Sequence, residues 1–163
     1  MKKIFNFVLV LVLIFNIVSC GNSIKSEALL KYINEDLAVL SEMETKFLES
    51  YESVTGNNYI NDYIMYEEFS RNTMVLSRDL NNKAIEIIKN IDDEEISELH
   101  RIYINLTSNY MNVVSLTLAA LETQDFTNIS LANEKLNNAN NLALDFKEKL
   151  NVLAEKYNVD IEK

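Results

Sequence analysis

A single cysteine, Cys20, carries the most reactive side chain in this 163-residue sequence. With no second cysteine in the sequence, Cys20 cannot form a disulfide within the chain. Lys2 and Lys3 come first, and an unbroken apolar run, FVLVLVLIF, follows at residues 7–15. A positive start and an apolar stretch of about 7–15 residues are typical of a secretory signal peptide, whereas a membrane-spanning helix needs about 20 apolar residues. The sequence therefore predicts export, with Cys20 at the end of the signal.

The tetrad Ile17-Val18-Ser19-Cys20 resembles a bacterial lipobox, where the cysteine thiol is lipidated and the chain is cut just before it. Lipoboxes usually have leucine at the position of Ile17. The resemblance implies a signal peptide over residues 1–19 and a lipidated cysteine with a short tether over residues 20–26. It also implies an extracytoplasmic protein, lipid-anchored to the bacterial cell membrane or outer membrane. An ordinary secretory signal or an uncleaved apolar anchor are the alternatives.

Charge excludes some classes of partner. Without residues 1–19 the chain has 13 basic and 25 acidic side chains, a net charge of −12. Such a chain repels nucleic-acid phosphates and anionic lipid headgroups, so we expect no nucleic-acid binding and a membrane contact through the lipid only.

The elements that must position any site are helices. The sequence contains no proline and only two glycines, and apolar residues recur at three- and four-residue spacing. This pattern predicts helices at about 26–54, 59–90, 93–122 and 128–157, with Gly56 ending the first and Asp92 capping the third. Short connections favour an all-α, up-down-up-down antiparallel four-helix bundle over residues 27–163. An extended two-helix coiled coil is the alternative. With the lipobox, such a domain resembles small helical-bundle lipoproteins.

Catalytic and metal-binding patterns are weak. His100 is the only histidine, so the paired Glu-x-x-His motifs of di-iron bundles are impossible, and no Gly-x-Ser-x-Gly occurs. We therefore predict no enzyme activity, no cofactor and no metal site. Glu44 falls on the apolar stripe of the first helix, and we expect Met43 to take its place in the core while Glu44 stays at the rim. His100 is expected at a half-exposed helix edge.

Two tyrosines near the first helix connection suggest a contact surface. Tyr59 and Tyr63 are one helical turn apart and lie off the apolar stripe, beside Asn57 and Asn58. Aromatic rings with neighbouring amides suit a protein or glycan contact. A bundle end simply covered by tyrosines is the alternative.

These features predict a membrane-anchored envelope lipoprotein whose helical bundle is a non-enzymatic interaction module for a protein or envelope partner. Adhesion, assembly and exclusion or immunity roles all fit. The alternative is a tethered bundle that binds a small ligand or a metal in a cavity near Glu44 and His100. The sequence leaves the oligomeric state open.

Overall fold

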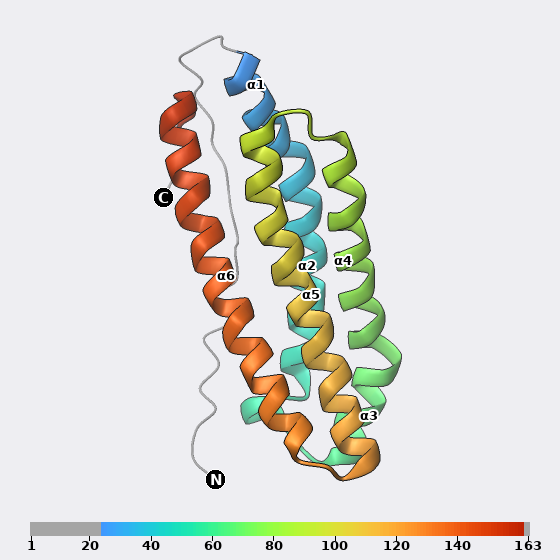
Figure 1. Cartoon of the computed structure of the whole chain (residues 1–163). Helices are drawn as coiled ribbons and strands as arrows, with labels where there is room; N and C mark the ends of the chain where they lie inside the picture. The colour runs from blue at the N-terminus through green and yellow to red at the C-terminus, as the bar shows by residue number, and fades with distance from the viewer. Residues whose placement is uncertain (1–23, 162–163) are drawn as a thin grey trace.

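A computed structural model describes residues 24–161. Cys20, its tetrad and the predicted signal peptide lie outside the described residues. Within them the protein is an all-helical bundle of four long helices and contains no strand (Figure 1). No helix in this part of the chain is both long and apolar enough to cross a bilayer.

The first two long helices each contain a π-helical turn. The first comprises α1 (Ile24–Lys31), the π turn η1 (Tyr32–Leu37) and α2 (Ala38–Ser53). After the short 3-10 turn η2 (Gly56–Asn58), the second comprises α3 (Asp62–Glu68), the π turn η3 (Phe69–Thr73), α4 (Met74–Ile87) and the 3-10 turn η4 (Ile88–Asn90). The third and fourth are unbroken: α5 (Glu94–Thr123) and α6 (Thr127–Tyr157).

Two helix starts differ from the sequence-based expectation. The second long helix begins at Asp62 instead of residue 59, because the side chain of Asn61 accepts a hydrogen bond from the Ile64 amide at 2.9 Å. The third is capped by Asp93, not Asp92: one Asp93 carboxylate oxygen accepts the amides of Glu95 and Ile96, each at 3.0 Å. In both cases a side-chain oxygen satisfies amides that lack a partner inside the helix.

The core follows the predicted apolar stripes. Each long helix turns one face inward, and the side chains of those faces form one continuous cluster. Among its members are Leu29, Ile33, Leu40, Phe47, Phe69, Leu80, Ala84, Ile96, Leu99, Leu106, Ala139, Ala143, Phe146 and Leu150. Burial of these faces is the main source of stability, since the isolated helices would be marginal in water.

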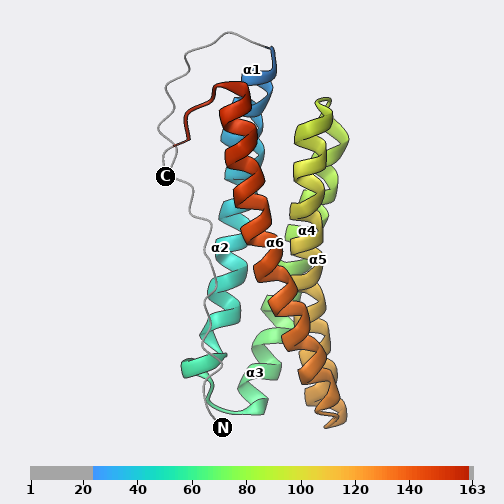
Figure 2. The same cartoon turned by 60° about the vertical axis from the view of Figure 1, so that its left-hand side comes forward.

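The connections gather at the two ends of the rod. The turn before α3 and the turn between α5 and α6 lie at one end, whereas the starts of α1 and α5 meet the end of α6 at the other (Figures 1 and 2). Hydrogen bonds join each end: Tyr66 donates to Glu122 at 3.0 Å, and Ser26 donates to the Tyr157 carbonyl at 2.6 Å. The rod is about 45 Å long, at 1.5 Å per residue for helices of this length.

Candidate functional site

The turn before α3 and the first turn of α3 expose the predicted tyrosines. Tyr59 and Tyr63 are 47% and 71% exposed, and Ile60 between them is 69% exposed. Gly56 makes this turn possible, because its φ of 57° is a left-handed conformation that costs glycine little. The Tyr59 hydroxyl donates to Asp62 at 2.6 Å, which fixes its ring relative to α3. The structure thus presents both rings to solvent, Tyr59 from the turn and Tyr63 from the start of α3.

The two predicted asparagines differ in their surroundings. The Asn58 amide donates to the Glu52 carbonyl at 2.9 Å and so caps the end of the first long helix. Asn57 is exposed on the same turn. Asn58 therefore has a structural task that the sequence analysis did not foresee, whereas Asn57 lies free to accept or donate to a partner.

A second turn brings another exposed ring to the same end. Phe126, between α5 and α6, is 72% exposed. Gln124 adopts a left-handed conformation with φ of 59°, and Asp125 accepts the Thr127 amide at 2.9 Å, so the turn is locally ordered. The sequence analysis left these residues between the predicted helices 93–122 and 128–157 and did not foresee the exposed ring. We call residues 56–64 together with residues 122–127 the tip.

Glu44 lies in the core, contrary to expectation. It is 4% exposed, and its two carboxylate oxygens accept hydrogen bonds from Tyr103 at 2.9 Å and from Tyr110 at 3.1 Å. Met43 is only partly buried. Burial raises the pKa of the Glu44 carboxyl, and the two tyrosine hydrogen bonds oppose that rise. Tyr103 and Tyr110 are seven residues apart on α5, so both face α2 and bracket the carboxylate.

His100 is also buried, not half-exposed at a helix edge. Its Nε2–H donates to the Ala84 carbonyl at 2.8 Å, and its Nδ1 accepts from the Tyr32 hydroxyl at 2.9 Å. Because a carbonyl can only accept, Nε2 must carry a proton, and in the neutral ring Nδ1 accepts from Tyr32, so both nitrogens have a partner. Burial lowers the pKa of His100. Tyr32 belongs to the π turn η1, which adds a residue to the helix and directs a polar side chain inward.

The buried polar groups satisfy one another. Every buried side-chain nitrogen and oxygen in residues 24–161 has a hydrogen-bond partner. Thr107 donates to Asn81 at 3.0 Å, and Ser50 lies 2.7 Å from the hydroxyl of Thr73. The arrangement of Glu44 and His100 can therefore specify which helix faces meet, a role that an apolar core fills less selectively.

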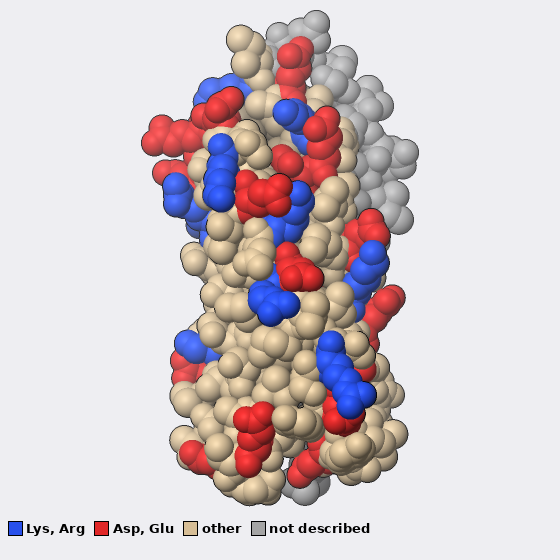
Figure 3. All heavy atoms as spheres, turned by 90° about the vertical axis from the view of Figure 1, so that its right-hand side faces the viewer, with Lys and Arg blue, Asp and Glu red and all other residues tan. Residues whose placement is uncertain are grey.

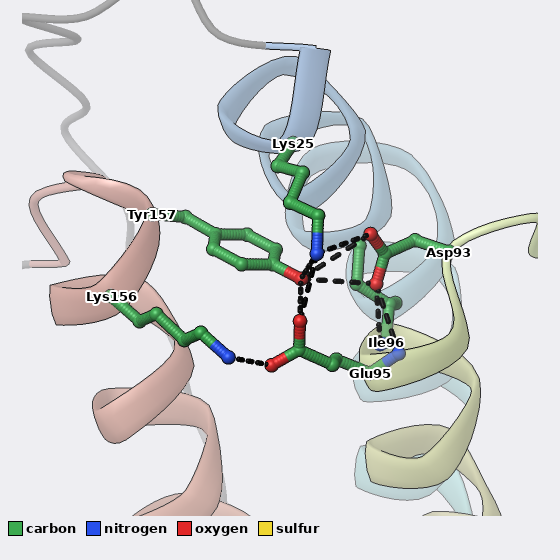
Figure 4. Close-up of polar contacts among 6 residues, drawn as sticks. All are labelled: Lys25, Asp93, Glu95, Ile96, Lys156 and Tyr157. Carbon is green, nitrogen blue, oxygen red and sulfur yellow. Dashed lines mark hydrogen bonds and ion pairs between the residues drawn. The ribbon is translucent and has the colours of Figure 1, made fainter.

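A polar cluster fastens the opposite end of the bundle (Figure 4). Glu95, at the start of α5, accepts hydrogen bonds from Lys25 of α1 at 2.8 Å, from Tyr157 of α6 at 2.9 Å and from Lys156. These bonds, those from Lys156 and Lys25 first, hold the pKa of Glu95 at about 2. Burial of the Tyr157 hydroxyl raises its pKa to about 12. We call Lys25, Asp93, Glu95, Lys156 and Tyr157 the clasp.

The clasp predicts acid sensitivity. A depressed pKa means that the contribution of Glu95 to stability is present above pH 4.5 and is lost as the pH falls toward 2. We expect Glu95→Gln to lower the melting temperature near neutral pH, and the difference from wild type to shrink progressively below pH 4.5. Thermal unfolding followed by circular dichroism across that range measures it. Glu94→Gln, one residue away and exposed, is the matched control and should change little. A difference that persists at pH 2 would contradict the assignment.

A shallow polar groove runs over the outer surfaces of α5 and α6. It is lined by Asn105, Ser108, Asn109, Lys135, Asn138, Asn141, Leu142 and Asp145. Asn109 donates to the Asn105 carbonyl at 2.7 Å, so one amide is already used. With no exposed ring among its lining residues, the groove lacks a stacking surface for a sugar.

Comparison with family models, with curated protein sequences and with solved structures found no match. The chain's own geometry therefore carries the functional argument. In the described residues, no group of three or more histidine, cysteine, aspartate or glutamate side chains is placed to hold a metal ion.

Proposed function

We propose that the protein is a membrane-anchored envelope lipoprotein whose up-down-up-down antiparallel bundle is a non-enzymatic interaction module for a protein partner. A lipid on Cys20 anchors it, and the tip makes the contact. The observation that supports this most is the exposure of Tyr59, Tyr63 and Phe126 together at one end. Aromatic side chains are over-represented among the residues that dominate binding energy at protein interfaces.

The chain's dimensions support an orientation in which the tip faces away from the membrane. Only three residues separate Cys20 from Ile24, so an extended link reaches about 14 Å. The end with the clasp then lies next to the membrane, and the tip lies about 45 Å farther out. A partner outside the membrane plane meets the tip first.

A small-ligand or metal-binding bundle centred on Glu44 and His100 is the alternative function. His100 is hydrogen-bonded to Tyr32, and Glu44 is hydrogen-bonded to Tyr103 and Tyr110. Those bonds would have to break before either residue could contact a ligand, and each buried hydroxyl left without a partner costs about 1–3 kcal/mol. This cost favours the interaction module.

Cross-linking in intact cells tests the contact. A photoreactive amino acid replaces Tyr63 in the full chain, and the matched control carries it at Glu148, an exposed position on α6 far from the tip. We expect a discrete adduct, identified by mass spectrometry, from position 63 and none from position 148. Equal adducts from both positions, or none from position 63, would contradict the proposal.

The anchor has its own test. Cys20→Ser should move the protein from the detergent phase to the aqueous phase, because a diacylglycerol anchor depends on a thioether at that sulfur and contributes about 0.8 kcal/mol per buried methylene. Unchanged partitioning of Cys20→Ser would show that the lipid anchor is absent.

A further inference from the structure

Exposed apolar side chains are concentrated at the tip. Five of the 12 large apolar side chains that are exposed in the described residues lie there, in two turns and the start of α3. They are Tyr59, Ile60, Tyr63, Ile64 and Phe126. Scattered exposed apolar residues are normal, whereas several on one small surface indicate a contact.

The same end of the bundle lacks positive charge. Residues 47–70 and residues 102–134 contain no lysine or arginine; both stretches include part of the tip, and the second also covers most of α5. Acidic side chains are exposed in both stretches: Glu49, Asp62, Glu122, Asp125 and Glu134. Figure 3 shows basic side chains from the clasp end down to the lower part of one face, whereas the charged side chains at the extreme tip of this face are acidic.

Ion pairs leave this charge largely uncompensated. Four basic residues border the two stretches: Lys46, Arg71, Arg101 and Lys135. Lys46 pairs with Glu42 at 2.6 Å, and Arg71 pairs with Glu67 at 2.8 Å. Within residues 24–161, no ion pair joins any of the four to an exposed acid of the tip. At the clasp, by contrast, Lys25 and Lys156 both contact Glu95. The two ends of one small domain therefore differ in charge balance.

We propose that the tip binds a positively charged, apolar-bearing protein segment. The apolar side chains of the partner pack on the exposed rings, and its lysines or arginines approach the acidic rim. This inference rests on the proposed function and adds the chemical class of the partner. Charge complementarity selects it, because the same rim repels acidic proteins and anionic lipid surfaces.

Size limits the contact. The end of a four-helix bundle is about two helix diameters across, roughly 20 Å on each side. That is about 400 Å², half of what one partner contributes to a standard interface. The tip therefore suits a short segment that binds weakly and rapidly, with an affinity that decreases as salt screens the charges.

Binding of matched peptides tests the charge preference. Three amphipathic helical peptides carry the same leucine face and differ in the polar face, which is lysine, glutamate or glutamine. We expect the lysine peptide alone to bind, and its affinity to fall about tenfold or more between about 50 mM and about 300 mM salt. Absence of binding by the lysine peptide, or equal binding by all three, would overturn the proposal.

Two sets of charge-neutralised variants localise the binding. The tip variant combines Asp62→Asn, Glu122→Gln and Asp125→Asn, each of which keeps an oxygen acceptor for the local hydrogen bonds. The control variant removes the same charge near the clasp, and it combines Glu27→Gln, Glu98→Gln and Glu155→Gln, all exposed. We expect the tip variant to weaken lysine-peptide binding about tenfold and the control to leave it within about twofold. Equal weakening by both would show only nonspecific attraction to an acidic protein and would overturn the proposal.

Two further measurements distinguish a failure of this inference from a failure of the proposed function. The protein that lacks the lipid on Cys20 should not bind to vesicles of zwitterionic lipid. Tip-dependent binding to them would identify a membrane surface as the occupant instead. In cells, an adduct at position 63 that persists at full yield in the tip variant would overturn the positively charged partner while leaving the interaction module intact. Loss of that adduct only in the tip variant, and not in the control, supports both.

Discussion

Replacing Glu44 with alanine is expected to lower the free energy of unfolding by about 3 kcal/mol. The carboxylate is the shared acceptor of Tyr103 and Tyr110, so its removal leaves two buried hydroxyls without a partner. Each costs about 1–3 kcal/mol, and the cavity left by the shortened side chain adds to the loss. Chemical denaturation with an unchanged m-value measures the difference. Glu49→Ala, exposed on the same helix, should stay within about 0.5 kcal/mol.

A triple variant separates the hydrogen bonds from the packing. Glu44→Leu with Tyr103→Phe and Tyr110→Phe removes all three polar groups together, and we expect it to recover most of the stability. A triple variant as unstable as Glu44→Ala would contradict the hydrogen-bond explanation.

The pH dependence has a definite sign: the pKa of Glu44 is raised above 4.5, so its favourable neutral form is lost as the pH rises through the folded-state value. Glu44→Gln removes this decline.

His100→Phe is expected to cost about 2 kcal/mol near neutral pH and to abolish one component of acid sensitivity. Phenylalanine keeps the ring volume but has no nitrogen, so the buried Tyr32 hydroxyl loses its acceptor. The Ala84 carbonyl suffers less, because it also accepts the Ile88 amide within the helix. Tyr32→Phe combined with His100→Phe should be more stable than the sum of the single changes predicts.

The acid component follows from the direction of the His100 shift. A pKa lowered by burial means that the contribution of the neutral ring is present above pH 6.5 and is lost as the pH falls toward the folded-state value. Because His100 is the only histidine in the sequence, its ring resonances can be followed by NMR without overlap from another imidazole. The same decline below pH 6.5 in His100→Phe as in wild type would show that another group causes it.

Both buried groups stabilise the fold in their uncharged forms. The contribution of Glu44 decreases as the pH rises above 4.5, and the contribution of His100 decreases as the pH falls below 6.5. Their hydrogen-bond partners come from three of the four long helices: Tyr32 from η1, the Ala84 carbonyl from α4, and Tyr103 and Tyr110 from α5. Each contact therefore links two long helices through a directional bond.

Part of the candidate site could be predicted because its signals are local. Tyr59 and Tyr63 fall off the apolar stripe beside turn-forming residues, and both are exposed. Phe126 carried the same signal, an aromatic residue in a turn. That the turn between α5 and α6 lies at the same end as the turn before α3 depends on the path of the whole chain (Figure 2). A sequence read one helix at a time does not bring two distant turns together.

The sequence by itself determined the helices and most of the buried stripes, because hydrophobic periodicity and the lack of proline act within one helix. The helix caps in the structure differ from the predicted ones by a few residues, since neighbouring polar side chains compete for the same amides. Only the tertiary structure decided that Glu44 and His100 are buried. A polar residue on an apolar stripe stays inside only if the facing helix supplies its hydrogen bonds, and here α5 supplies the tyrosines for Glu44 while η1 and α4 supply the partners of His100.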